Sequence, residues 1–175
     1  MIRRWIKDTH GLAAVEFALI APVMVAALLG MIEVNNIITS YSKSVSAAQS
    51  VSDLVSQSNS LVTSQVDSIV VAAQRILDPL ISDATTLSVD VSSIALDAND
   101  KPYQAWTYHW GKSSTPPSPT LATGLGAANE SVIVAALSYT CTPLIHEILP
   151  QATFNEIAIT RPRTTRKIAY NGVTG

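Results

Sequence analysis

One carboxylate stands inside the most apolar stretch of the chain. Glu16 lies five residues after Gly11, and every other residue from Leu12 to Ile32 is apolar, small or proline. A carboxylate near the first turn of a helix is stabilised by about 0.3–1 kcal/mol by the helix macrodipole, and it can also pair with a cation. Glu16 is therefore a candidate ion partner, placed near the start of a helix.

The element that must position Glu16 is a membrane-spanning helix over residues 12–32. At about 1.5 Å per residue this segment would extend roughly 31 Å, close to the ~30 Å hydrocarbon core of a bilayer. Two arginines and a lysine precede it, with only Asp8 opposing them. The positive-inside rule then places residues 1–11 in the cytoplasm and the rest of the chain outside. A cleaved secretory signal and an uncleaved signal anchor remain open as alternatives.

Pro22 lies inside the same segment and has no amide hydrogen to donate. It removes one backbone hydrogen bond of the helix, and in a membrane the freed carbonyl needs another partner, often within a bundle of helices. We expect a kink at Pro22 that helps the helix to dock against partner helices.

Composition limits the classes of function. The chain has 175 residues, only 14% of them charged against about 25% in average soluble domains, and a net charge of −2. This length suits one domain plus a membrane segment, and the low content of lysine and arginine argues against a nucleic-acid partner. The single cysteine, Cys141, excludes an intrachain disulfide and is interpreted as a small buried hydrophobic residue.

Two helical patterns follow the membrane segment. Residues 41–55 carry apolar side chains every three to four positions, which predicts that an apolar stripe continues outward, and the polar run 56–60 predicts a break. Ser64 and Asp67 have the spacing of a capping box for a second helix, which we expect to end near Pro79.

The hydrophobic period then changes to that of strands. Residues 87–97 and 103–110 alternate as the two strands of a hairpin, 130–141 is apolar enough to be a central strand, and 154–163 is a fourth candidate. Residues 113–120 form a Pro/Ser loop. The predicted fold class is α+β, with an N-terminal transmembrane helix, a helical arm and a small antiparallel sheet. The expected divisions are a leader (1–11), transmembrane helix (12–32), arm and second helix (33–80), sheet domain (81–163) and loose tail (164–175).

No motif predicts catalysis, a cofactor or a metal site. His10, His109 and His146 are scattered, and the sequence around His146 lacks the second histidine of the zinc-helix motif. The Gly-rich run 124–129 follows a proline loop rather than a strand, and no nucleophile elbow is present. We therefore expect no enzyme activity.

Three aromatic residues share one face of the strand over 103–110. Trp106, Tyr108 and Trp110 recur at every second position, with Tyr103 nearby. Their burial would pack the sheet against the helices. Their exposure would instead make a patch that binds a partner subunit or a surface.

The start of the chain resembles the leader of type IV pilins and pseudopilins, and more narrowly the TadE-like family of tight-adherence (Flp) pilus systems. Basic residues, a glycine, four small or apolar residues, a glutamate and an apolar helix follow one another in this order. The segments "SYTCTPLI" and "ITRPR" resemble the loosely shared C-terminal part of the family, whereas residues 34–36 depart from its pattern. The matching positions are Gly11, Ala14, Val15, Glu16, Phe17, Ala18, Leu19, Pro22, Leu28, Leu29, Gly30 and Glu33.

This resemblance implies that a prepilin peptidase cuts between Gly11 and Leu12. The new amine of Leu12 would be largely cationic at neutral pH and could be answered by Glu16 of the same helix or of a neighbouring subunit. Glu16, Phe17 and Pro22 are the residues that the resemblance assigns to assembly.

The resulting hypothesis is a minor pseudopilin of the bacterial inner membrane, with a cytoplasmic N-terminus and a periplasmic or extracellular pilin-like domain. It would be needed for pilus assembly or initiation, without a cofactor. The partners that the resemblance implies are the prepilin peptidase, other pilin-like subunits, the pilus assembly machine and the lipid bilayer. An adhesin-like minor subunit and an uncleaved membrane-anchored structural protein remain the alternatives.

Overall fold

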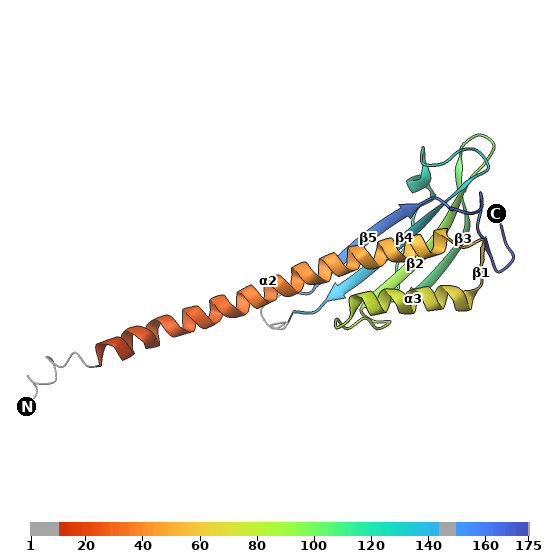
Figure 1. Ribbon diagram of the computed structural model, residues 1–175. Coiled ribbons are helices and arrows are strands. Elements are labelled where there is room, and N and C mark those ends of the chain that lie inside the picture. The colour runs from red at the N-terminus through yellow and green to blue at the C-terminus, as the bar shows by residue number, and fades with distance from the viewer. Residues whose placement is uncertain (1–10, 144–149, 175) are drawn as a thin grey trace, which may run out of the picture.

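The computed structural model describes residues 11–143 and 150–174, and its dominant element is one long helix. This helix, α2, runs unbroken over Leu12–Ser56, so the predicted membrane segment and the predicted outer helix are a single element. Its first half projects away from the rest of the molecule (Figure 1). Between residues 12 and 32 every residue except Ala21 is exposed. By length and composition α2 can cross a membrane.

A four-stranded antiparallel sheet forms the second part of the molecule, which confirms the α+β class. Its order is β3-β2-β4-β5, so β2 and β4 are central. Alternating or continuously apolar sequences form these strands because their side chains fill cores on both faces of the sheet. The strands are β2 (Leu87–Leu96), β3 (Pro102–Gly111), β4 (Ser131–Cys141) and β5 (Ala152–Thr160).

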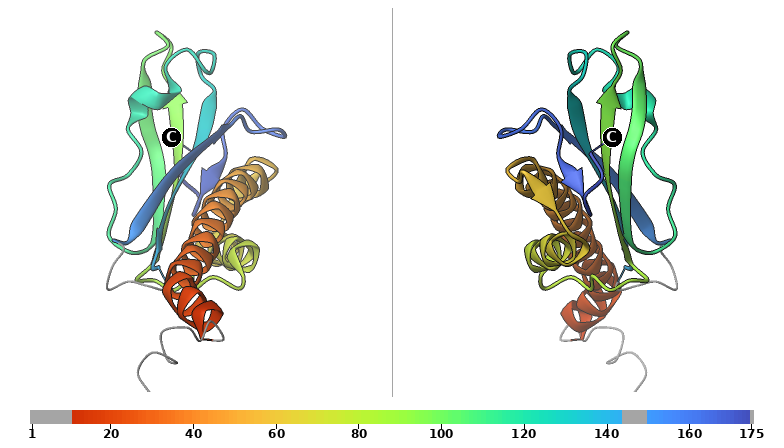
Figure 2. Two further views of the ribbon diagram at one scale, coloured as in Figure 1. Left: turned by 90° about the vertical axis from the view of Figure 1, so that its left-hand side faces the viewer. Right: turned by 90° about the vertical axis from the view of Figure 1, so that its right-hand side faces the viewer.

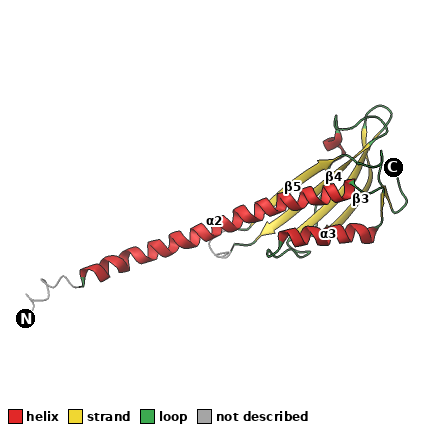
Figure 3. Cartoon of the chain, viewed as in Figure 1, coloured by secondary structure: helices red, strands yellow, loops and turns green. Residues whose placement is uncertain are grey.

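The second half of α2 and the shorter helix α3 (Thr63–Leu77) lie together on one face of the sheet (Figures 2 and 3). The main core lies between these layers, and α3 gives it the apolar face that its sequence predicts, with Val66, Val70, Ala73 and Leu77 buried. On the opposite face a smaller cluster gathers under the short 3-10 helix η1 (Pro119–Ala122).

The start of α3 differs from the predicted capping box. The Val62 amide donates to Oε1 of Gln65 at 3.0 Å, so Gln65 rather than Asp67 reaches back over the first turn. Asp67 points instead toward the sheet, where its carboxylate accepts a hydrogen bond from the Tyr108 hydroxyl. Burial, together with the Asp67 carboxylate, raises the pKa of Tyr108, so the phenol stays protonated and remains a donor. The predicted cap was wrong because Asp67 is used in tertiary structure.

The segment after residue 163 is packed onto the domain, and the prediction of a loose tail was wrong. Its strand β6 (Ala169–Tyr170) pairs in parallel with β1 (Ser60–Leu61), directly after α2. Ile168 is 1% exposed, and its carbonyl accepts a hydrogen bond from the Trp106 indole at 2.7 Å. A short strand without regular alternation gives no local signal, and its pairing partner lies more than 100 residues earlier.

The aromatic face of β3 belongs to the core. Trp106 and Tyr108 are 6% and 7% exposed, and Trp110 is half-buried against the same cluster. Tyr170 of β6 stacks on Trp106 with ring centroids 5.1 Å apart. The core-packing alternative is therefore confirmed. Cys141 is also buried, as predicted.

Replacing Trp106 with Phe should loosen the C-terminal segment. The change keeps an aromatic ring but leaves the buried Ile168 carbonyl without its indole donor, so we expect a loss of about 1–3 kcal/mol in the free energy of unfolding. Chemical unfolding of the full chain in detergent measures this loss, and limited proteolysis near Lys167 reports release of the segment. Trp110→Phe is the matched control, and equal effects of the two changes would contradict this role of the indole.

Candidate functional site

The predicted cleavage point lies where α2 begins. Gly11 is the N-cap residue, with φ −91° and ψ −10°, and its carbonyl accepts the first helical hydrogen bond from the amide of Val15 at 3.2 Å. Gly11 and Leu12 are both exposed. The bond between them therefore lies at the exposed start of the helix. Residues 1–10, which include His10 and the basic residues of the predicted leader, lie outside the described part of the chain.

The fold itself does not require a glycine at position 11. Its φ is negative, a conformation open to any L-residue. A Cβ built on Gly11 has no heavy atom within 4 Å beyond its immediate chain neighbours. Ser, Thr, Asp or Asn would cap the helix better, because their side chains accept from the free amides of the first turn. Backbone conformation and packing of the described chain thus leave the choice of glycine unexplained.

Glu16 and Phe17 face outward from the first turns of α2. Both residues are exposed, Phe17 at 67%, and the structure places Glu16 one turn after Leu12 on the same helix face. Glu16 makes no hydrogen bond or ion pair with residues 11–143 or 150–174 that would satisfy its carboxylate within the monomer. These two side chains are therefore open to a partner outside this chain.

Pro22 does not interrupt the helix. The α2 backbone continues through it as one rod (Figure 1). The Ala18 carbonyl nevertheless loses its amide partner there, because proline has no N–H. On another side of the helix, Phe17, Ala21, Met24 and Leu28 line a shallow apolar groove.

Glu33 marks the point where α2 meets the domain. Met31, Ile32 and Val34 are exposed, whereas Glu33 is 2% exposed. The predicted membrane segment ends at residue 32, so Glu33 is the first residue beyond it. The structure adds that the helix passes into the folded domain at this residue, so the domain begins directly after the predicted membrane segment.

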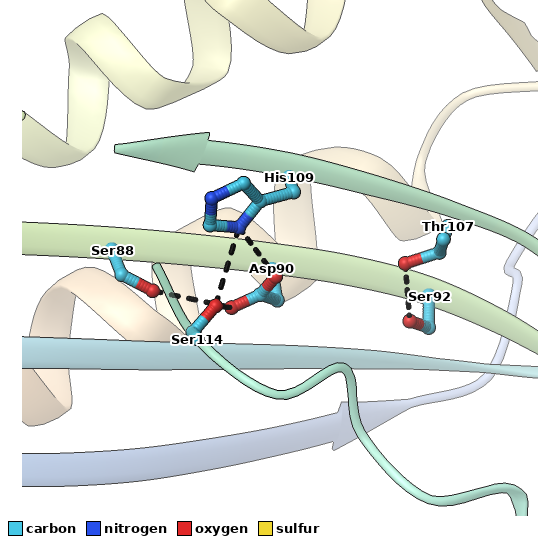
Figure 4. A network of polar contacts seen from close by, with 6 residues as sticks. All are labelled: Ser88, Asp90, Ser92, Thr107, His109 and Ser114. Atoms are coloured by element: carbon cyan, nitrogen blue, oxygen red, sulfur yellow. Dashed lines mark hydrogen bonds and ion pairs between the residues drawn. The ribbon is translucent and has the colours of Figure 1, made fainter. Parts of the chain in front are cut away.

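A second polar group lies on the outer face of the sheet, opposite the helices (Figure 4). Asp90 of β2 has a side chain that is 3% exposed, and its Oδ1 accepts from Nδ1 of His109, 2.8 Å away on β3. Its Oδ2 accepts from Ser88 at 3.2 Å and from Ser114 in the loop after β3. Three donors thus satisfy one buried carboxylate, as burial of a charge requires.

This group has the residue types of a hydrolase triad but not the geometry. In a Ser-His-Asp triad the serine and the aspartate contact opposite nitrogens of the imidazole. Here Ser114 Oγ and Asp90 both contact Nδ1 of His109, at 3.2 Å and 2.8 Å, and the serine hydroxyl donates to Asp90 itself. The histidine cannot take the proton of Ser114, so the group anchors the loop 112–117 to the sheet.

Sequence reasoning treated His109 as isolated and did not connect it with Asp90. The hairpin between β2 and β3 was predicted, but pairing Asp90 with His109 requires the exact register, which shifts at the bulged residue Ala105. No group of three or more potential metal ligands occurs in the parts of the chain that the structure describes. The "HEILP" segment lies outside them.

Residues 11–52 match the family model described as TadE-like protein. The matched region begins at Gly11 and contains Glu16, Phe17, Pro22 and Glu33, which confirms the resemblance over about a quarter of the chain. The family match associates this chain with the tight-adherence pilus machinery, as a protein similar to the pseudopilins. Neither the curated proteins nor the solved structures include a match to this chain.

Replacing His109 with Ala should destabilise the sheet and weaken the attachment of the loop 112–117, in which Ser114 keeps its bond to Asp90. The buried Asp90 carboxylate would lose its hydrogen bond with His109 Nδ1. We expect a loss of about 1–3 kcal/mol in the free energy of unfolding, and the partial exposure of the imidazole keeps the loss from being larger. Thermal unfolding of the full chain in detergent measures the cost. Ser113→Ala, in the exposed loop beside it, should leave stability unchanged, and a neutral His109→Ala would refute the anchoring role.

Proposed function

We propose that this chain is a minor pseudopilin of a tight-adherence pilus, held in the bacterial inner membrane by the first half of α2 and needed for pilus assembly or initiation. The observation that carries the proposal is the junction at Gly11. A glycine that the fold does not require stands directly before the helix, five residues ahead of an exposed carboxylate, where the family match begins.

Processing would be hydrolysis of the peptide bond between Gly11 and Leu12. Water supplies the oxygen of the new Gly11 carboxylate, and Leu12 keeps a free α-amino group with an ordinary pKa near 8, so it is mostly cationic at neutral pH. The exposed junction admits a peptidase, and a glycine offers no side chain to obstruct it. Membrane insertion with the basic N-terminus inside would put this bond at the cytoplasmic face.

After cleavage, the negative charge of Glu16 would attract the cationic amine of a neighbouring helix. A carboxylate inside an apolar bilayer is costly unless a cation answers it. Two unit charges about 4 Å apart attract by about 4 kcal/mol at an effective dielectric of 20, before desolvation is subtracted. Because Glu16 is exposed and has no partner among the described residues, the amine of a neighbouring subunit is the partner that makes the charge useful in assembly.

The structure favours assembly over adhesion as the role of the domain. An exposed aromatic patch on β3 would have offered one surface for adhesion, but Trp106 and Tyr108 lie in the core. Within residues 11–143 and 150–174, the cluster of Asp90, His109 and Ser114 has catalytic residue types but lacks a competent geometry. We accordingly propose a structural role rather than an enzymatic one.

Changing Gly11 to Leu should block maturation without disturbing the fold. The bulky side chain has open space around it in the folded chain but would obstruct the peptidase at the scissile bond. Intact mass and N-terminal sequencing should show the native chain starting at Leu12 and the variant retaining Met1. Gly30→Ala, also in open space on α2, is the control and should mature normally. Normal cutting of the Gly11 variant would contradict the proposal.

Changing Glu16 to Gln should abolish pilus formation while leaving processing and membrane insertion intact. The amide keeps the shape of the side chain but removes the charge that would attract a neighbouring amine. Pili counted by electron microscopy, with the mature mass measured in the same cells, test this. Glu156→Gln removes a carboxylate from the domain and serves as the control. Normal pilus numbers in the Glu16 variant would remove Glu16 from the assembly mechanism.

A further inference from the structure

The strand β5 forms an open edge of the four-stranded sheet. It pairs with β4 on one side, and no strand pairs with its other side within residues 11–143 and 150–174. An unpaired edge presents a row of backbone donors and acceptors to its surroundings. This row is long, because β5 extends over nine residues. The edge of β5 is therefore a surface that can take up another extended backbone.

The hydrogen bonds of the neighbouring strands show which β5 groups are free. The Thr140 amide of β4 donates to the carbonyl of Thr86, just before β2, at 2.8 Å, so Thr140 faces β2. In an antiparallel ladder, successive residues of a central strand bond alternately to the strands on its two sides. The odd-numbered residues of β4 therefore bond to β5, where they lie opposite the even-numbered residues. The amides and carbonyls of β5 that point to the open edge are those of Thr153, Asn155, Ile157 and Ile159.

The sequence of β5 lacks the features that usually protect an edge strand from pairing. Proline, lysine, a bulge or a very short strand serve this purpose in other proteins. The other edge strand, β3, begins with Pro102, and its register with β2 shifts. In contrast, β5 contains no proline, glycine or basic residue, its register with β4 is unbroken, and Glu156 is its single charged residue. Its large side chains Ile157 and Ile159 are 53% and 36% exposed, so the edge is open and partly apolar.

A groove beside this edge has room for an added strand. It lies between α2 and β5, has a volume of about 350 Å³, and is lined on the α2 side by Val45, Ala48, Gln49 and Asp53. The side chains of an added strand would point alternately into this groove and to the outer face of the sheet, where Ile157 is exposed. Small or polar side chains therefore fit toward α2, and apolar side chains fit beside Ile157.

A second copy of this chain does not fit the edge. β5 runs in the same direction as α2 (Figure 1), since Tyr41 contacts Phe154 while Ser52, further along the helix, contacts Thr160. Antiparallel pairing of two β5 strands would point the two α2 helices in opposite directions, so both could not enter one membrane from the same side. A twofold axis along two parallel β5 strands would place each free donor opposite the same donor of the other copy. The partner is therefore a different protein.

We propose that the β5 edge binds an extended segment of a different protein as an added antiparallel strand, which is the more stable kind of pairing. The main chain of the segment bonds to the four free residues of β5, and its alternate apolar side chains pack on Ile157 and Ile159. This binding surface goes beyond the proposed pilus function. Only the exclusion of a second copy rests on the proposed membrane anchoring, and none of the inference rests on cleavage after Gly11.

A synthetic peptide tests the inference with the full chain in detergent. The peptide has nine residues, like β5, that alternate threonine and valine, and a lysine at each end for solubility. With the valines opposite the free residues of β5, an antiparallel strand directs its valine amides to β5 and its threonine amides away. We expect saturable binding by fluorescence anisotropy. N-methylation of the valines should weaken binding by about tenfold or more, and N-methylation of the threonines should leave it nearly unchanged.

Hydrogen exchange and a pair of variants locate the bound peptide. The peptide should slow exchange of the Asn155 and Ile157 amides, whereas the Glu156 amide, which already faces β4, should not change. Ile157→Ser should weaken binding by about threefold through the loss of a cross-strand apolar contact. Ile81→Ser is the matched control, because Ile81 is also exposed but lies between α3 and β2, and it should leave binding unchanged.

The proposal is overturned if the unmodified peptide does not bind, or if methylated threonines weaken binding as much as methylated valines or more. Protection of the edge amides that rises with the concentration of the chain alone would assign the edge to a second copy and would also overturn it. The assay uses neither processing nor Glu16. A failure of the proposed pilus function therefore leaves the peptide result unchanged, and a failure of peptide binding contradicts this inference alone.

Discussion

The rest of the structure depends on how closely the second half of α2 packs against the sheet. That contact uses small side chains, with Ala47 and Ala48 among the buried serines, so the helix backbone approaches β4 and β5 closely. The serine hydroxyls are satisfied locally or across the interface. Ser44 donates to the Ser40 carbonyl at 2.8 Å, and Ser52 lies 2.8 Å from the Thr160 hydroxyl on β5. These serines can therefore be buried with their hydroxyls hydrogen-bonded.

Because α2 is continuous, this packing also determines how the domain is carried above the membrane. A flexible link at residue 33 would let the domain turn freely, whereas a helix that is packed on one half transmits its direction to the other. The far end of α2 is clamped by the C-terminal segment. Arg163 binds Asp53 at 2.7 Å, its amide donates to the Ser56 carbonyl at 2.9 Å, and β6 pairs with β1 directly beyond. The last residues of the chain thus secure the first element.

Local patterns predicted the elements well, and long-range contacts account for what they missed. The alternation of residues 87–97 and the apolar run 130–141 are properties of single segments, so both strands could be recognised from sequence. The docking of Ile168, the use of Asp67 by Tyr108 and the pairing of Asp90 with His109 each join segments far apart in the chain. The last of these also depends on the bulge at Ala105, which no local signal marks.

The N-terminal site differs from these contacts. The spacing of Gly11 and Glu16 could be recognised from the sequence, but contacts within the folded monomer do not explain it. Gly11, Glu16 and the exposed apolar side chains of residues 12–32 share one property: no contact within the described chain explains why these residues stand there. A glycine at a negative φ, an exposed carboxylate in an apolar helix and an exposed row of large apolar side chains would each weaken a protein that acted alone. All of them lie along one helix. In the second half of this helix, the side that faces the sheet is packed with serine, alanine and valine side chains. Such a division assigns one side of α2 to the fold of its own chain and leaves the other side exposed, as the proposed membrane anchoring and assembly require.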